Sequence, residues 1–371
     1  MDTFAFVIHP IHPKRDISRK FPLLGWIAND FTIRAFAPLF PPVYISEITG
    51  ITSASTGKQI QGWFIACPLT PKLILELPEK IVYRKIIETG RLAERLGAQI
   101  LGLGAYTSVV GDAGQTIASV LDIPVTTGDS YTVSVAMQAV YKAAEVMDIP
   151  QKTACAAVVG ASGAIGQVCA ELMAGQVAKL YLIGRRQEAL EALRDKIVDE
   201  NTSTGHCAEI ITSTNLEVIR ESNLVITVTS SLSTVIEPDY LRPGSVVCDV
   251  ARPRDVSEKV AAMREDVLVI DGGMVDVPGP VDFHFDFGFP TGKAYACMAE
   301  TMALALEGRF TDYTVGKQIS RAKVDEITTI AQKHGFQLSG FRSFERAVTE
   351  EQIEKVRRKA KQNVSLNSRH K

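Results

Sequence analysis

The chain has 371 residues, of which 46% are hydrophobic and 22% are charged, a composition typical of a globular protein with two or three domains. Lys and Arg number 40 against 42 Asp and Glu, so the net charge is −2 and no general basic field for nucleic acid is expected. The apolar runs are far shorter than the roughly 18–20 residues that cross a bilayer, and the run 4–8 lacks the basic start of a signal peptide. The six cysteines form no metal-binding spacing, so we expect a cytoplasmic protein with reduced thiols and no metal site.

Residues 1–148 are predicted to form an N-terminal α+β substrate domain. Polar residues follow its predicted strand 100–104 and precede its predicted helix 131–147. Thr107 and Ser108 could face a cofactor across a cleft, although Thr-Ser also occurs in ordinary turns. Asp129 could orient a substrate, although it is equally suited to cap the helix. The other elements predicted here are strands 4–8, 44–52 and 59–65 and the helix 81–96.

Residues 149–290 alternate between strand and helix patterns, which predicts a Rossmann-type domain with a parallel sheet and covered faces. The fold class is therefore α/β, with the N-terminal α+β domain before this sheet and helices after it. The predicted strands are 153–159, 179–183, 208–212, 224–228, 245–250 and 267–270, and the predicted helices are 164–174 and 188–198.

A glycine-rich loop, residues 160–166, lies between the first strand and the first helix of this domain. Glycines let the backbone approach a pyrophosphate, whose charge binds to the N–H groups of the helix start. The spacing departs from G-x-G-x-x-G, but the context of strand, loop and helix indicates a dinucleotide site. The expected cofactor contacts are Gly160, Ser162, Gly163, Ala164, Ile165 and Gly166 in the loop, with Thr229, Ser230, Gly272 and Gly273 at later strand ends.

Two arginines, Arg185 and Arg186, follow the second strand of the predicted Rossmann domain. An acidic residue there would bind the ribose hydroxyl of NAD, whereas a guanidinium accommodates the 2′-phosphate of NADP. We therefore expect NADPH, the alternative being that both arginines belong to a surface loop.

Residues 291–371 are predicted to form C-terminal helices over 293–307 and 320–334 and from Thr349, which with Gln352 matches a capping box. These helices are expected to pack across the cleft. The last helix is acidic at its start and basic at its end, as the helix dipole favours. The basic tail 355–371 could also attract an acidic carrier protein or an anionic membrane surface.

Several motifs in one order carry a family resemblance: 48–57 with Gly62, 103–108 (LGAYTS), 126–129 (TTGD), 160–166, 295–300 (YACMAE), 307–308 and 333–337. In these segments the chain resembles the aldehyde-forming long-chain acyl-[acyl-carrier-protein] reductases, which are shikimate-dehydrogenase-like Rossmann proteins. In that family a cysteine takes the acyl group from a carrier thioester, and NADPH reduces the enzyme thioester to an aldehyde. The resemblance implies that Cys297 is this cysteine and that acyl carrier protein or acyl-CoA is the substrate donor. Asp129 departs from the family pattern, which commonly has asparagine there.

The neighbours of Cys297 allow two interpretations. Lys293 stands four residues earlier, on the same face of the predicted helix, where its charge would lower the pKa of the thiol. Glu300 stands three residues later and could polarise a water molecule, or pair with a nearby cation. The same spacing also fits a cysteine that merely packs in an apolar helix face.

Two other functions stay open. A dehydrogenase of the shikimate or amino-acid type would transfer hydride directly, without a covalent intermediate. It would need a Lys–Asp pair in the first domain, and the loops 104–108 and 126–130 contain no lysine. A nucleotide-sensing protein would keep the Rossmann fold without turnover.

Overall fold

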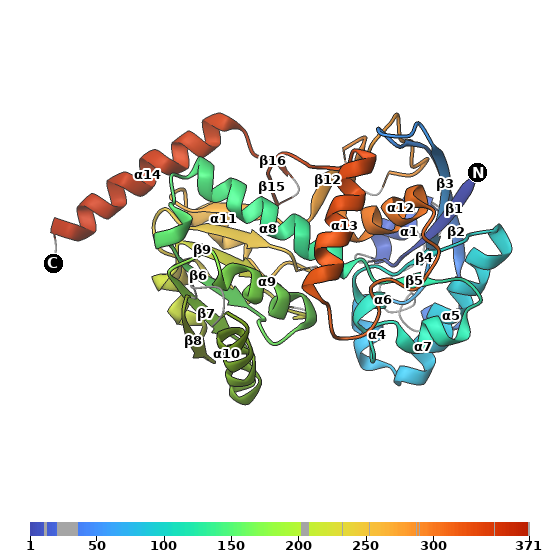
Figure 1. Ribbon diagram of the computed structural model, residues 1–371, viewed down its shortest axis with the longest axis horizontal. Helices are drawn as coiled ribbons and strands as arrows, with labels where there is room; N and C mark the ends of the chain where they lie inside the picture. Colours follow the sequence, from blue (N-terminus) through green and yellow to red (C-terminus); the bar gives the residue numbers. More distant parts are fainter. Residues whose placement is uncertain are drawn as a thin grey trace. The chain divides into compact units, whose positions relative to one another are not determined.

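The computed structural model describes residues 1–10, 13–20, 36–201, 208–231, 233–251, 253–286, 288, 290–344 and 346–369, so Cys207 lies outside it. The chain divides into two compact units (Figure 1). The first unit comprises Met1–Tyr131 and Met274–Gln337, and the second comprises Thr132–Gly273 and Leu338–Lys371. Residues 291–337 thus belong with the N-terminal segment, whereas the sequence analysis grouped them with the last helix.

The first unit is built on a five-stranded sheet with the order β2-β3-β1-β4-β5. β2 is antiparallel to β3, and the remaining neighbours are parallel. Ala5 and Val7 of β1 join the core beneath α5 (Glu79–Leu96), while Phe6 faces the opposite side of the sheet, which α12 (Ala296–Glu307) covers. The strands are β1 (Asp2–Ile8), β2 (Val43–Thr52), β3 (Gln59–Ala66), β4 (Leu101–Gly102) and β5 (Val125–Thr126).

Helix α12 runs against the direction of the parallel strands. Its first turn packs on Gly128, just after β5, whereas its last carbonyls bond to Lys58, which pairs with Asp2 at the start of β1. Close packing fixes the middle of the helix, because a Cβ on Gly102 would lie 2.1 Å from Oγ1 of Thr301. The N-terminus of α12 therefore lies at the carboxyl edge of the sheet.

The first unit contains further short elements. A three-stranded sheet has the order β13-β12-β14, formed by β12 (Met274–Asp276), β13 (Lys293–Tyr295) and β14 (Gln337–Leu338), of which Leu338 is counted with the second unit. Its other helices are α1 (Pro13–Lys20), α4 (Pro71–Glu76), α6 (Tyr106–Val109), α7 (Gln115–Val120) and α13 (Arg321–His334).

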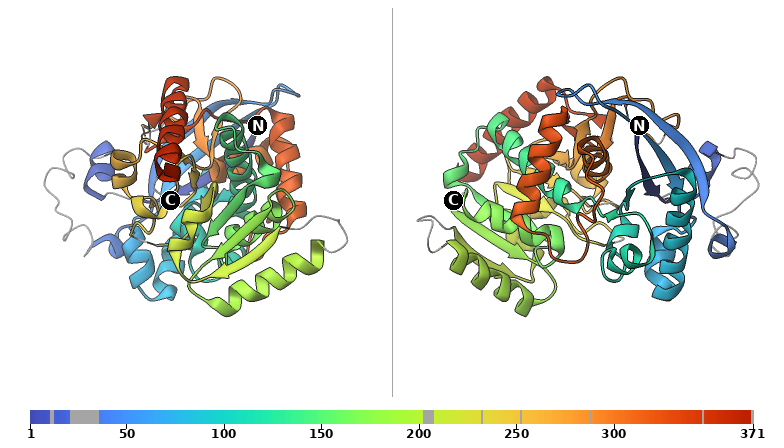
Figure 2. Two further views of the ribbon diagram at one scale, coloured as in Figure 1. Left: turned by 90° about the vertical axis from the view of Figure 1, so that its left-hand side faces the viewer. Right: turned by 45° about the vertical axis from the view of Figure 1, so that its right-hand side comes forward.

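The second unit has a six-stranded parallel sheet with the order β11-β10-β9-β6-β7-β8. Numbered from its own first strand, β6, this is the doubly wound Rossmann order, which confirms the predicted α/β class. Figure 2 (left) shows the strands in green to yellow with α10 running along the sheet. The strands are β6 (Cys155–Val159), β7 (Lys179–Ile183), β8 (Glu209–Ser213), β9 (Leu224–Thr227), β10 (Val246–Asp249) and β11 (Leu268–Asp271).

Helices flank and follow this sheet. They are α8 (Asp129–Val146), whose first three residues belong to the first unit, and α9 (Ala164–Ala174), α10 (Gln187–Asn201), α11 (Glu258–Met263) and α14 (Glu350–Arg369). A short hairpin of β15 (Arg342–Ser343) and β16 (Arg346–Ala347) precedes α14. The predicted capping box is confirmed, because the N–H of Thr349 donates to Gln352 Oε1 at 2.9 Å and the N–H of Gln352 donates to Thr349 Oγ1 at 3.2 Å.

The start predicted for the helix 293–307 is wrong. Lys293–Tyr295 pairs with β12 in an antiparallel register and forms β13, so the helix begins at Ala296. A three-residue strand depends on its partner, which the local sequence pattern does not reveal. Cys297 consequently lies in the first turn of α12 instead of the second.

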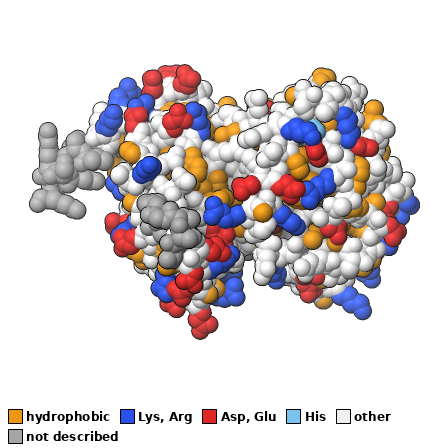
Figure 3. All heavy atoms as spheres, in the orientation of Figure 1, with side chains coloured by type: hydrophobic (Ala, Val, Ile, Leu, Met, Phe, Trp, Pro, Cys, Tyr) orange, Lys and Arg blue, Asp and Glu red, His pale blue; other side chains and the backbone are white. Residues whose placement is uncertain are grey.

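Charges of both signs are mixed on the face of the molecule that Figure 3 draws, with acidic and basic side chains side by side. In the described part of the chain, no helix is both long and apolar enough to span a bilayer.

Candidate functional site

The loop between β5 and α8 packs directly on the start of α12. Gly128, in the predicted TTGD motif, has a φ of +79°, and a Cβ there would lie 2.3 Å from the Cα of Cys297. A side chain at this position would collide with backbone, so only glycine permits the approach. Two motifs that are far apart in the sequence, 126–129 and 295–300, thus meet at one place in the first unit.

Cys297 is the second residue of α12 and is partly exposed to solvent. The first turn of a helix favours a thiolate, and the N–H groups of Cys297 and Met298 act in that direction. Burial opposes them, the carboxyl groups of Asp129 and Glu300 add to its effect, and together they raise the pKa of the thiol to about 12. The resting sulfur is therefore a thiol at neutral pH, and it needs a proton acceptor to act as a nucleophile.

Glu300 is fully buried one turn after Cys297, and three donors hold its carboxyl group. The N–H of Tyr131 donates to Oε2 at 2.8 Å, and the hydroxyls of Thr314 (2.8 Å) and Thr126 donate to Oε1. Burial raises the pKa of Glu300, and these hydrogen bonds oppose the rise. The sequence analysis missed Thr314, which gives no local signal, and did not single out Thr126 within the TTGD motif.

Asp129 is the first residue of α8 and is only 7% exposed. Burial raises its pKa, the charge of Glu300 raises it further and the hydroxyl of Thr127 opposes them, so that the pKa is about 7. The structure brings the segments of Asp129, Cys297 and Glu300 together, because Gly128 packs on Cys297 and the N–H of Tyr131 donates to Glu300.

The structure places three other predicted residues differently. Lys293 lies in β13, where its ammonium group pairs with Asp276, so its predicted position on the helix face of Cys297 is wrong. The Thr107 hydroxyl donates to the carbonyl of Gly104 at 2.8 Å, and the Ser108 hydroxyl donates to the carbonyl of Ala105 at 2.6 Å. Both hydroxyls thus bond within their own turn, and the expected role toward a cofactor stays a prediction.

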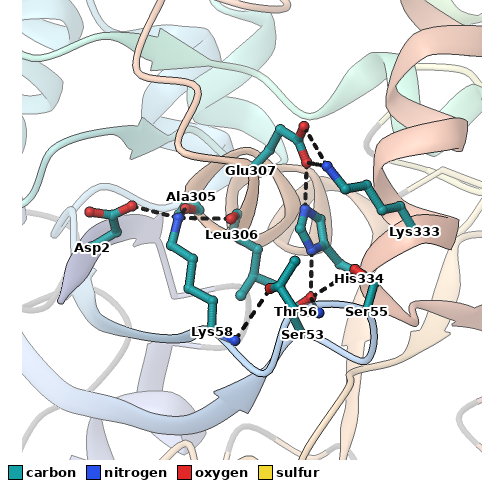
Figure 4. Close-up of polar contacts among 10 residues, drawn as sticks. All are labelled: Asp2, Ser53, Ser55, Thr56, Lys58, Ala305, Leu306, Glu307, Lys333 and His334. Atoms are coloured by element: carbon teal, nitrogen blue, oxygen red, sulfur yellow. Dashed lines mark hydrogen bonds and ion pairs between the residues drawn. The ribbon is translucent and has the colours of Figure 1, made fainter.

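A polar cluster secures the far end of α12 (Figure 4). Lys58, in the turn between β2 and β3, donates to the carbonyls of Ala305 (3.1 Å) and Leu306 (2.8 Å). Glu307 accepts from Lys333 at 2.8 Å and lies 2.7 Å from Nε2 of His334. The other ring nitrogen of His334 lies 2.8 Å from the hydroxyl of Ser53 in the same turn, so this turn, α12 and α13 are joined at one point. The sequence analysis did not find this cluster.

The glycine loop of the second unit has the shape that a pyrophosphate requires. Gly160 follows β6 with a φ of +86°, and a Cβ on Gly166 would lie 2.3 Å from the carbonyl oxygen of Gly160. Gly163 precedes α9 without a side-chain cap, which leaves the first N–H groups of α9 to bind an anion. Gly160 lies beside Val228 at the end of β9, so the loop occupies the switch point of the sheet.

The two arginines after β7 lie next to this loop. A Cβ on Gly184 would lie 3.4 Å from the hydroxyl of Ser162, so the segment that carries Arg185 and Arg186 adjoins the glycine loop. Both guanidinium groups are exposed, and neither forms an ion pair with any residue of the described ranges. They are available to bind a phosphate.

The four predicted cofactor contacts that follow β9 and β11 have different surroundings. The Thr229 hydroxyl donates to Asp255, which is fully buried, so Thr229 orders its own loop. Ser230 is exposed. Gly272 packs against Val250, where a Cβ would lie 2.7 Å from a methyl carbon, and Gly273 has a φ of +87°.

Comparison with known proteins agrees with this division of the chain. A family model described as shikimate / quinate 5-dehydrogenase matches residues 142–271, which lie within the second unit. The aminotransferase PigE of Serratia sp. is 31% identical over 310 residues, which cover 83% of this chain but only 36% of PigE. The long-chain acyl-[acyl-carrier-protein] reductase of Synechococcus elongatus is 30% identical over 339 residues, which cover 87% of this chain and 94% of that protein. The chain belongs to this reductase family. It is therefore an oxidoreductase of the long-chain acyl-[acyl-carrier-protein] reductase family.

Among solved structures, shikimate 5-dehydrogenase of Listeria monocytogenes, crystallised with shikimate and NAD, is 13% identical to this chain. The match covers 89% of this chain and 96% of that enzyme, with a TM-score of 0.35.

Proposed function

We propose that the protein reduces long-chain acyl thioesters to aldehydes with NADPH through an acyl group held on Cys297. The observation that carries the proposal is the position of Cys297, which is partly exposed in the first turn of α12 and packed against Gly128. The relationship to the Synechococcus elongatus reductase supports an acyl thioester as substrate.

The residues of the first unit account for acyl transfer. The Cys297 sulfur attacks the carbonyl carbon of the substrate, the bond from that carbon to the carrier sulfur breaks, and the acyl group stays on Cys297. The N–H groups at the start of α12 stabilise negative charge on the sulfur. Glu300, through its three hydrogen bonds, fixes the loop between β5 and α8 against α12.

The second unit binds the reductant. Its glycine loop suits a dinucleotide pyrophosphate, because Gly160 and Gly166 let the loop pack tightly on its own backbone before the uncapped start of α9. NADPH, when bound there, supplies the hydride that reduces the acyl carbonyl carbon. Cleavage of the carbon–sulfur bond to Cys297 then releases the aldehyde and leaves the sulfur as a thiolate, which takes up one proton from solvent to restore the thiol.

Arg185 and Arg186 favour NADPH over NADH because they are exposed and unpaired among the described residues. Replacing both with alanine removes the charge-assisted hydrogen bonds to the 2′-phosphate, each worth about 1.5–3 kcal/mol. We expect KM for NADPH to rise at least ~10-fold with little change in KM for NADH. Equal effects on both cofactors would contradict the assignment.

The proposed donor of the acyl group is acyl carrier protein or acyl-CoA. The direct test is aldehyde production from palmitoyl-CoA and palmitoyl-[acyl-carrier-protein], with NADPH oxidation followed in parallel. We expect C297A to lose aldehyde production completely. Cys155 is the matched control, since it is also partly exposed but lies in β6. C155A is expected to keep the wild-type rate, and activity in C297A would refute the proposal.

The family model for shikimate / quinate 5-dehydrogenase favours a second candidate, direct hydride transfer to a small alcohol or ketone. That match covers residues 142–271 and so concerns the second unit, whereas Cys297 lies in the first. Turnover of shikimate by the C297A variant would support this candidate.

A further inference from the structure

We propose that Asp129 accepts the proton of the Cys297 thiol during acyl transfer and returns it to the sulfur of the departing carrier. This role rests on the proposed function, because it requires an acyl group to move onto Cys297. An acidic side chain, buried and near enough for its charge to act on the thiol, occupies the position after Gly128, the residue that packs on Cys297.

The backbone geometry fixes Asp129 at the thiol. Gly128 lies so close to Cys297 that a Cβ on it would be 2.3 Å from the Cα and 2.4 Å from the Cβ of the cysteine. Asp129 is the next residue, its side chain is buried, and its charge acts on the sulfur. Main-chain packing therefore holds the residue before Asp129 against Cys297, and the short side chain of Asp129 is anchored at its base by this contact.

Glu300 is the other carboxyl group whose charge acts on the thiol, but three hydrogen bonds already hold its oxygens. Oε1 accepts from two threonine hydroxyls and Oε2 accepts from the N–H of Tyr131. Protonating Glu300 would weaken these bonds, because all three donors favour the negative charge, so Glu300 is better suited to remain a fixed anion. Lys323 of α13 supports this state, because its charge lowers the pKa of Glu300.

The environment of Asp129 suits a group that gains and loses a proton near neutrality. Burial and the charge of Glu300 raise its pKa to about 7, with the Thr127 hydroxyl in opposition. General bases are most effective when their pKa lies near the working pH. The carboxylate form, which accepts the proton, is populated above about pH 7.

The step balances without any further reagent. As the Cys297 sulfur forms its bond to the acyl carbon, its proton moves to a carboxylate oxygen of Asp129. The bond between the acyl carbon and the carrier sulfur then breaks, and the proton passes from Asp129 to that sulfur. The products are the acyl-enzyme and the free carrier thiol, and Asp129 is again a carboxylate.

The test is the rate of Cys297 acylation by palmitoyl-CoA without NADPH, measured by quenched intact-mass analysis between pH 5.5 and 9. For the wild type we expect the rate to rise with pH through about 7 and then to level off. D129N, which keeps the size of the side chain, is expected to acylate ~10²-fold more slowly at pH 8 and to lose this inflection.

Alkylation of Cys297 by iodoacetamide separates proton transfer from misfolding. D129N removes a negative charge that disfavours the thiolate of Cys297. If Asp129 acts only during acyl transfer, iodoacetamide should therefore alkylate Cys297 of D129N at least as fast as Cys297 of the wild type. Acylation of D129N at the wild-type rate, or a wild-type rate independent of pH between 6 and 8, would overturn the inference. A wild type that is never acylated on Cys297 would instead contradict the proposed function itself.

Discussion

Three titratable side chains, those of Cys297, Asp129 and Glu300, lie in one part of the first unit; both carboxyl groups raise the pKa of the thiol, and Glu300 also raises that of Asp129. Burial disfavours all three charged forms, and only Glu300 has enough hydrogen-bond donors to offset much of this cost. An ionisable side chain held in surroundings that disfavour its charged form lowers the stability of the folded protein. Such side chains are common at functional sites, which need a group in an unusual protonation state.

The cost in folding stability can be measured for Asp129. Its folded pKa of about 7 exceeds the unfolded value of 3.8, so the folded state binds more protons and stability falls as pH rises between these values. D129N should therefore be more stable than the wild type at pH 8, by up to about 4 kcal/mol, with the gain vanishing near pH 4. Urea denaturation at both pH values measures this. D199N, at an exposed position of α10, is the control and should show no such gain at pH 8.

At the scale of elements, α12 connects the thiol to the rest of the first unit. Its N-terminus carries Cys297 against Gly128, and Lys58 bonds its last carbonyls, some ten residues or about 15 Å further along the helix. The axial position of α12 therefore depends on contacts at both ends.

A substitution of Lys58 tests whether the position of α12 depends on the contact at its C-terminal end. Replacing it with methionine keeps the aliphatic stem but removes the donor to the carbonyls of Ala305 and Leu306. We expect the free energy of unfolding to fall by about 1–3 kcal/mol, and kcat to fall with little change in KM. The matched control is K142M, because Lys142 forms only an exposed pair with Glu145 and should change stability by less than about 0.5 kcal/mol. Equal stability of K58M and K142M would contradict the assigned role.

The elements also show what the sequence could predict. Alternating strand and helix patterns predicted α9 and β7 with their observed bounds, because buried strands and amphipathic helices carry their signal locally. Strand β13 was missed because it exists only through its pairing with β12. For the same reason Thr314 and the contact of Ser53 with His334 could not be predicted, since both bring together residues far apart in the chain.

For the molecule as a whole, charge is nearly balanced, yet the end of α14 is basic. Lys355 and Lys359 pair with Glu265, and Arg357 pairs with Asp148. Arg358 and Lys361 are exposed and form no ion pair within the described ranges, and with Glu354, Arg357 and Gln362 they line a surface hollow. We propose that, among the tail side chains that the structure describes, these two attract an acidic carrier protein.

Reversing their charge tests that role. For the double variant R358E/K361E we expect KM for palmitoyl-[acyl-carrier-protein] to rise about 3- to 10-fold at low salt, and KM for palmitoyl-CoA to change little. K142E, at an exposed position on α8, controls for a general change in charge. An equal rise for both substrates would rule out a contact specific to the carrier.

The acyl group on Cys297 is the central claim, and one mass measurement tests it most directly. The wild type and C297A are incubated with palmitoyl-CoA in the absence of NADPH, and the intact protein and its peptides are weighed. We predict one palmitoyl adduct, located on Cys297, that disappears when NADPH is added and that C297A never forms. No adduct on the wild type, or the same adduct on C297A, would contradict the account.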